Sequence, residues 1–116
     1  VQGFSKFGSY LGNGSADGTF VYTGFKPAFI MVKRTNTTGA WGMYDNKRDS
    51  FNVVDLGLAA DLTSAEDFTT NDESDFLSNG FKLRSTGGSM NASGSTYIYM
   101  AFAEQPLVGD NPATAR

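Results

Sequence analysis

The sequence predicts an all-β fold: a single antiparallel β-sandwich, jelly-roll-like, with about six to eight short strands. Three observations support this prediction. The chain has 116 residues, enough for one domain and too few for two. Aromatic residues make up 14% and charged residues only 18%, and short apolar runs alternate with turns rich in glycine. Two runs, 28–33 and 96–103, are apolar on both faces, as in central strands covered on both sides.

The N-terminal region is expected to form two neighbouring strands. Phe4–Leu11 has the composition of a first strand, and Thr19–Tyr22 has that of a second. Between them lie Asn13-Gly14 and Asp17-Gly18. These dipeptides reach positive φ at low cost, so hairpin geometry is expected between the two strands.

Two further strands follow. Ala28–Lys33 is expected in the middle of a sheet because both of its faces are apolar. Ala40–Tyr44 is the next predicted strand, after a polar turn at 35–39, and the charged stretch 45–49 closes it.

The middle of the chain mixes several patterns. Phe51–Leu62 contains strand-like alternation. Thr63–Glu66 has the capping-box pattern, with Thr at the N-cap and Glu three residues later, which favours one helical turn. Thr69–Asp75 is acidic and polar and is expected to be an exposed loop.

The C-terminal third begins with a half-buried strand, in which Phe81 and Leu83 alternate with charged residues after the turn Asn79-Gly80. Thr96–Ala103 is the longest apolar run and the second expected central strand. We therefore place the sandwich domain at residues 1–104. Gln105–Arg116 is expected to be an extended tail.

The expected core takes one apolar set from these strands. Its members are Phe20, Tyr22, Phe29, Ile30, Val32, Trp41, Phe81, Leu83, Ile98, Met100 and Phe102.

Composition excludes several classes of function. The chain has no histidine and no cysteine, which removes the usual general base, thiol catalysis and cysteine-based zinc sites. Its formal net charge of −3 argues against nucleic-acid binding, and no apolar stretch is long enough to suggest a membrane span. We expect no enzyme activity and no cofactor. The chain begins with Val1, which we interpret as a fragment, a processed product or a trimmed form.

Carboxylates provide an alternative to a non-enzymatic role. Asp72, Glu73 and Asp75 lie close together in the expected acidic loop. A pair of carboxylates held on either side of a sugar can hydrolyse a glycosidic bond, although a polar loop holds such a pair poorly. Oxygen-rich loops also bind calcium, but Asn71–Asp75 lacks the full EF-hand pattern.

The segment around the fourth expected strand carries the candidate ligand site. Trp41 and Tyr44 supply rings for the apolar face of a sugar, and Asp45, Asn46 and Arg48 supply hydrogen-bonding groups for hydroxyls. The low net charge suits a neutral glycan better than a polyanion. Two other interpretations stay open. Trp41 shares a face with Met43 at period two and would then fill a core, or Asp45 and Arg48 pair across a subunit interface.

Five sequence blocks carry a resemblance to a known family: Phe4–Tyr10, Thr23–Arg34, Trp41–Arg48, Gly80–Ser85 and Asn91–Glu104. Together they span nearly the whole chain. The chain resembles an uncharacterised β domain of structural proteins of tailed, often marine, bacteriophages. There the domain often forms the C-terminal part of long virion or tail-fibre-like proteins, and related domains lie beside lectin-like modules.

This resemblance implies a location on the surface of the phage particle. A tail fibre or appendage is the preferred context, with a capsid-decorating protein or a domain of a secreted adhesin as alternatives. The chain is rich in aromatics and poor in charge, so we expect self-association or contact with other virion subunits. Binding of host-surface carbohydrate is a further expectation, with several weak sites acting together.

Overall fold

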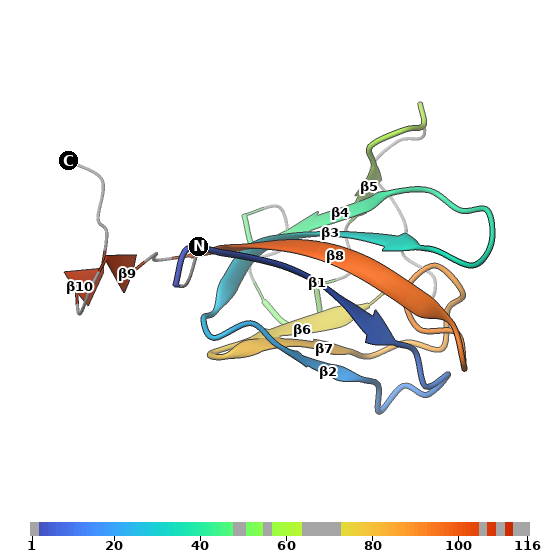
Figure 1. Ribbon diagram of the computed structural model, residues 1–116, viewed down its shortest axis with the longest axis horizontal. Helices are drawn as coiled ribbons and strands as arrows, with labels where there is room; N and C mark the ends of the chain where they lie inside the picture. The colour runs from blue at the N-terminus through green and yellow to red at the C-terminus, as the bar shows by residue number, and fades with distance from the viewer. Residues whose placement is uncertain are drawn as a thin grey trace.

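Two antiparallel β-sheets pack against each other in the computed structural model, which describes residues 3–47, 51–54, 57–63, 73–104, 107–108 and 111–112 (Figure 1). The five-stranded sheet has the order β1-β8-β3-β4-β5, and the three-stranded sheet has the order β2-β7-β6. The strands of the first sheet are β1 (Ser5–Leu11), β8 (Thr96–Ala103), β3 (Pro27–Arg34), β4 (Gly42–Asp45) and β5 (Gly57–Ala59). Those of the second are β2 (Phe20–Tyr22), β7 (Gly80–Leu83) and β6 (Ser74–Leu77). The predicted all-β antiparallel sandwich is confirmed, and no helix occurs in the described part of the chain.

The predicted hairpin between the first two strands is wrong. β1 pairs with β8, while β2 pairs with β7 in the other sheet. The connecting loop 12–19 crosses from one sheet to the other and is held at both ends by backbone hydrogen bonds. Gly12 N donates to Ser95 O (2.9 Å), and Gly18 N donates to Leu83 O (2.9 Å). The turn dipeptides therefore lie in a loop that connects the two sheets and not in a tight hairpin.

The core lies between the sheets and contains tyrosines that the sequence pattern did not indicate. In β8 the side chains of Tyr97, Tyr99 and Ala101 point inward and are buried. Tyr10 of β1 stacks on Tyr97 with ring centroids 5.1 Å apart and meets Phe81 of β7 edge-on at 6.0 Å. The contact between Tyr10 and Phe81 joins the two sheets. The buried cluster comprises Tyr10, Val21, Phe25, Ile30, Val32, Tyr44, Val54, Phe76, Phe81, Leu83, Met90, Tyr97, Tyr99 and Ala101.

The tyrosine hydroxyls find partners in the loop 85–95, at one end of the sandwich. The Tyr97 hydroxyl donates to Gly88 O (2.7 Å) and accepts a hydrogen bond from Ala92 N (2.8 Å). The Tyr10 hydroxyl donates to Met90 O (2.8 Å). Burial of a hydroxyl is favourable only when it is hydrogen-bonded, so these bonds allow the rings to face inward.

The predicted core is therefore correct in part. Ile30, Val32, Phe81 and Leu83 are buried as expected. Phe20, Tyr22 and Ile98 are exposed, which corrects the prediction for them. The remaining members are half-buried: Phe29, Trp41, Met100 and Phe102. Successive side chains of a strand point to opposite faces of the sheet. Val21 of β2 and the tyrosines of β8 point inward, so the residues next to them along each strand point outward.

The middle of the chain also differs from expectation. Ser74–Leu77 is a strand, so the end of the expected loop Thr69–Asp75 belongs to β6. Within Phe51–Leu62, the described residues form only β5 and an isolated bridge from Val54 to Ser74. Residues 64–66, where the helical turn was expected, lie outside the described residues, as do Asn71 and Asp72.

At the C-terminus, β8 ends at Ala103, and β9 (Leu107–Val108) pairs with β10 (Asn111–Pro112) in a separate two-stranded ladder. The other residues of the expected tail after 104 lie outside the described part. A search of the described residues finds no helix with the length and hydrophobicity that a membrane span requires.

Candidate functional site

The structure separates the residues of the predicted glycan site. Tyr44 points into the core and is only 1% exposed, so its ring is not accessible to a sugar. Trp41 precedes β4 and lies half-buried on the opposite side of the strand, where its backbone N–H donates to Asp61 Oδ1 (3.1 Å). Arg48 lies outside the described residues. Trp41 and Tyr44 therefore do not act together on one ligand.

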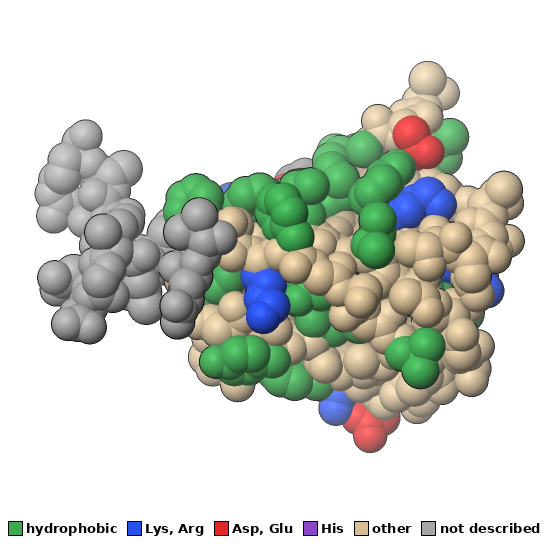
Figure 2. Space-filling view, viewed as in Figure 1, with side chains coloured by type: hydrophobic (Ala, Val, Ile, Leu, Met, Phe, Trp, Pro, Cys, Tyr) green, Lys and Arg blue, Asp and Glu red, His purple; other side chains and the backbone are tan. Residues whose placement is uncertain are grey.

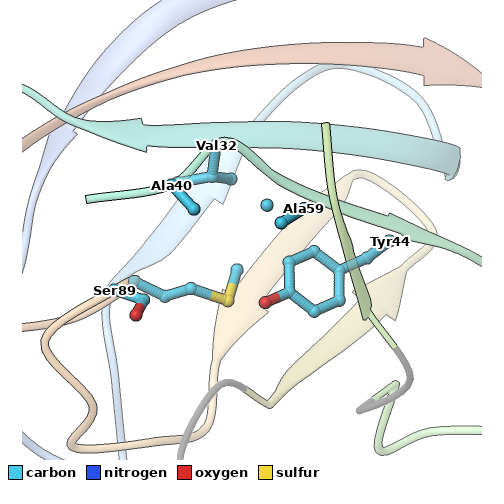
Figure 3. A pocket seen from close by; sticks show the side chains of 7 residues that line it. Val32, Ala40, Tyr44, Ala59 and Ser89 are labelled. Atoms are coloured by element: carbon cyan, nitrogen blue, oxygen red, sulfur yellow. The ribbon is translucent and has the colours of Figure 1, made fainter. Parts of the chain in front are cut away.

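Figure 3 shows the surroundings of Tyr44, whose ring lies among side chains of the five-stranded sheet, Ala40 before β4 and the loop 85–95. The space left beside it is about 30 Å³ and is lined by Val32, Ala40, Ala59 and Met90, among others. This is room for about one water molecule and not for a sugar. Tyr44 is a packing residue.

Asp45 and Asn46 form the start of a turn after β4. Lys47 N donates to Asp45 Oδ1 (2.9 Å), an arrangement that fixes the turn through the carboxylate. Asn46 N donates to Ala28 O (3.0 Å), which ties the turn to β3. Asn46 Oδ1 is buried and accepts no hydrogen bond in the described structure. The turn therefore carries two of the predicted residues in a defined position.

Beside this turn lies a polar hollow of about 410 Å³, which we call the Phe51 hollow. Phe51 is 83% exposed, the largest exposure among the apolar side chains described. Lys26 and Glu104, which both line the hollow, form an ion pair in which Lys26 Nζ lies 3.5 Å from Glu104 Oε2. The described residues that line it are Lys26, Asn46, Lys47, Phe51, Asn52, Val54, Phe76 and Glu104.

Sequence reasoning found only Asn46 of this lining. Phe51 stood at the start of a run interpreted as a strand, and an aromatic residue directly after a charged turn was the available signal. Lys26 and Glu104 become neighbours because β3 pairs with β8, with Pro27 opposite Ala103. The two residues are 78 positions apart in the sequence, and their contact depends on that strand pairing. The local sequence pattern therefore could not predict it.

The second feature is the outer apolar face of the five-stranded sheet. Strand pairing aligns one residue from each strand in a row across the whole sheet. The row is Phe7, Met100, Met31, Met43 and Leu58. Phe7 is 64% exposed, and the four others are half-buried. Figure 2 shows hydrophobic side chains gathered over the region of β8 and β3.

Neighbouring positions extend this face. Phe102 makes edge-on contacts with the rings of Phe4 (6.2 Å) and Phe7 (6.1 Å) and lies 6.1 Å from that of Phe29. On the other side of the row, a shallow groove of about 360 Å³ runs between Phe7 and Trp41 over Ile98 and Met100. Trp41 and Met43 thus do share a face, but it is the outer face and not the core.

Among the described residues, the carboxylates of Asp17, Asp75 and Glu104 lie in ion pairs, and those of Asp45 and Asp61 accept backbone hydrogen bonds. Asp75 Oδ2 lies 3.6 Å from Arg84 Nε across β6 and β7. Asp17 pairs with Lys82, and this hydrogen-bonded contact holds the pKa of the Asp17 carboxyl below its ordinary value. Within the described residues, no three Asp or Glu side chains are grouped to hold a metal ion. The calcium interpretation concerned Asn71–Asp75, part of which lies outside those residues.

Comparison with known proteins gives one match. No curated protein and no solved structure matches the chain. Residues 1–106 match the family model described as a domain of unknown function, DUF7483. Because this match covers nearly the whole chain, the protein belongs to the DUF7483 family.

Proposed function

We propose that this chain is a non-enzymatic structural module that assembles with further copies of itself through the outer apolar face. The observation that carries the proposal is the unbroken apolar row from Phe7 on β1 to Leu58 on β5. An antiparallel sheet with one face in a core usually presents polar residues on the other face. Here both faces are apolar, and within the described residues no further sheet packs on the second one.

The area of the outer apolar face is suitable for contact with a second copy of the chain. Strands about 4.8 Å apart with about 3.3 Å per residue give the face an area of roughly 500 Å². Two such faces in contact remove roughly 1,000 Å² from water, about the lower limit for a specific interface. An apolar patch of this size is often a functional surface, and a second copy of the chain presents a face of matching area.

Charge supports a second copy as the occupant. Register places one basic residue, Lys33, and one acidic residue, Asp45, at outward positions of this face. Lys33 lies opposite Ile98 on β8, and Asp45 lies opposite Phe29 on β3. The face therefore carries no net charge, and two copies meet without electrostatic repulsion. A self-complementary surface of this type is what a two-fold symmetric pair requires.

The biological context of the proposal is a phage particle, with a tail fibre or appendage as the preferred position. It is supported by the resemblance of five sequence blocks to a β domain of tailed-phage structural proteins. A capsid-decorating protein or a secreted adhesin domain would use the same face in the same way. The absence of histidine and cysteine from the whole chain supports a role without catalysis.

Analytical ultracentrifugation of the full chain tests the assembly. We expect a concentration-dependent dimer or larger species, and Met31→Glu at the centre of the row weakens association at least about tenfold because it places a charge in the contact. Tyr22→Glu is the matched control, since Tyr22 is 62% exposed in the other sheet. A wild-type chain that stays monomeric at millimolar concentration would contradict the proposal, and so would equal effects of the two variants.

A further inference from the structure

We infer that the Phe51 hollow binds an acidic sugar, a hexuronic acid unit of a polysaccharide. This inference goes beyond the assembly proposed above and uses a different surface. The hollow is formed by the turn after β4, the segment 51–54 and the residues that flank the β3–β8 pair. None of these residues belongs to the apolar row.

Size is the first argument. Ligand sites in proteins enclose about 300–1,000 Å³. The hollow of about 410 Å³ lies in this range, and the cavity beside Tyr44 lies far below it. Its lining combines apolar groups at Val54 and Phe76 with three charged and two amide side chains. This mixture suits a ligand with an apolar face and many hydroxyls.

The exposed ring is the second argument. Phe51 leaves most of its surface in water at the edge of the hollow, at the full hydrophobic cost. An aromatic ring in this position offers a flat apolar surface to the C–H groups of a sugar ring. Val54 and Phe76, which also line the hollow, are buried in the core cluster, whereas the ring of Phe51 lies outside that cluster.

The third argument is that the segment carrying Phe51 is held in place by hydrogen bonds. The Asn52 side chain imitates a strand partner of β6, since its Nδ2 donates to Phe76 O (3.0 Å) and its Oδ1 accepts from Phe76 N (2.9 Å). Two residues later, Val54 N donates to Ser74 O (2.7 Å) and Ser74 N donates to Val54 O (3.0 Å). The segment that carries Phe51 is thus anchored to β6, and binding requires little ordering of the chain.

Charge selects the class of sugar. Lys26 and Glu104 face each other at 3.5 Å and neutralise one another. Lys47 also lines the hollow, is exposed, and forms no ion pair with a described residue. Among the described lining residues there is therefore an excess of one positive charge. A uronate supplies one carboxylate for Lys47, a ring face for Phe51 and hydroxyls for the Lys26–Glu104 pair. The net charge of the whole chain favoured a neutral glycan, and the local charge of this site favours an acidic one.

The test titrates the full chain with three sugars, D-glucuronate, D-galacturonate and D-mannuronate, and with the three matching neutral hexoses. Amide chemical shifts in NMR spectra report where each sugar binds. We expect at least one uronate to shift the amides around residues 46–54 and 104, with affinity at least about tenfold above its hexose. Acetate is included because it carries the carboxylate without the ring, and we expect it to bind much more weakly.

Two pairs of variants locate the binding. Phe51→Ala and Lys47→Met each weaken uronate binding about tenfold, by removal of the ring and of the charge. Phe20→Ala and Lys33→Met, matched substitutions on the other sheet and on the outer face, leave it unchanged. Equal binding of hexose and uronate, equal binding of acetate, unchanged binding by Phe51→Ala, or no shift with any uronate overturns the inference. The oligomeric state of Phe51→Ala, measured in parallel, separates this outcome from a failure of the proposed assembly.

Discussion

At the scale of single residues, Asn91 joins two loops that are distant in sequence. It is completely buried, and its Nδ2 lies 2.9 Å from Asn13 Oδ1, from Ser15 O and from Ser85 O. Its Oδ1 accepts from Asn13 N at 3.0 Å. The loop that crosses between the sheets is thereby fixed to the loop that receives the tyrosine hydroxyls. A fully buried polar side chain is acceptable at this end of the sandwich because its hydrogen-bonding groups have partners.

Asn91→Leu is expected to lower the free energy of unfolding by about 3 kcal/mol, since it removes the partner of the buried Ser85 O and the bonds to Asn13 and Ser15. Urea denaturation followed by tyrosine and tryptophan fluorescence measures the change. Asn36→Ala serves as the control, because Asn36 is exposed and its hydrogen bonds stabilise the fold little. A loss in the Asn91 variant no larger than in the control would show that the two loops hold their positions independently.

The Asp17–Lys82 pair gives a prediction for pH. The pKa of Asp17 is lowered from its ordinary value of 3.8, mainly by the hydrogen bond from Lys82. A carboxyl with a lowered pKa in the folded state stabilises the fold above its ordinary pKa and loses this contribution as the pH falls through the folded value. Because Asp17 is fully exposed, the effect on stability is small. An NMR titration of the Asp17 carboxyl detects it directly: Lys82→Met returns the pKa of Asp17 towards 3.8, whereas Lys33→Met leaves it lowered.

At the scale of elements, the short strand β2 depends on a close approach to β7. Gly80 lies opposite Tyr22, and a Cβ at position 80 would collide with the carbonyl oxygen of Val21. β2 has only three residues, so it cannot shift without losing its pairing. The three-stranded sheet thus requires glycine at this position, for reasons of space and not of φ.

Gly80→Ala is therefore expected to destabilise the fold by about 3 kcal/mol through overpacking against backbone. Gly39→Ala is the matched substitution, since a Cβ there meets no atom within 4 Å. It should change stability by less than about 0.5 kcal/mol. Thermal unfolding monitored by circular dichroism compares the two, and similar midpoints for both variants would refute the packing argument.

At the scale of the whole molecule, the sandwich has one core, and the outer face of its five-stranded sheet carries an apolar row that no other described sheet covers. Methionines mark both: Met31, Met43 and Met100 lie in the outer row, and Met90 is buried in the core. Thioether oxidation requires access to the sulfur. The methionines therefore report whether the outer face is covered.

Mild oxidation by hydrogen peroxide, followed by mass spectrometry of peptides, gives the measurement. We expect the three outer methionines to be oxidised at low protein concentration and to become protected as the concentration rises and copies associate. Met90 is the internal control, and we expect it to be oxidised slowly at every protein concentration. Oxidation of the outer row at a rate independent of protein concentration would count against the second copy as the partner.

Much of the strand content was contained in the sequence. The runs expected at 4–11, 28–33 and 96–103 correspond within one residue at each end to β1, β3 and β8, and the strand around Phe81 and Leu83 corresponds to β7. These elements are recognisable because β-branched and aromatic residues between glycine- and asparagine-rich turns favour extended backbone locally.

The local sequence pattern could not determine which side chains of the central strands point into the core. When both faces are apolar, alternation does not state which face is buried, and Ile98, Met100 and Phe102 of β8 were expected in the core. The tertiary structure selected Tyr97 and Tyr99 instead, because the loop 85–95 provides backbone partners for the hydroxyl of Tyr97, while Gly8 on β1 leaves room for the ring of Tyr99. The same selection turned Ile98 and Met100 to the surface and thereby produced the outer apolar face.

The sequence by itself determined an all-β chain, the positions of its main strands, and a chemistry without histidine or cysteine, since these depend on composition and on neighbours along the chain. Only the tertiary structure decided that β1 and β2 belong to different sheets, that Tyr44 lies in the core, and that Phe51 stands beside Lys26, Lys47 and Glu104. These facts depend on strand pairings between residues far apart in sequence, and the free energy that selects such pairings comes from burial of the whole core and not from any local segment.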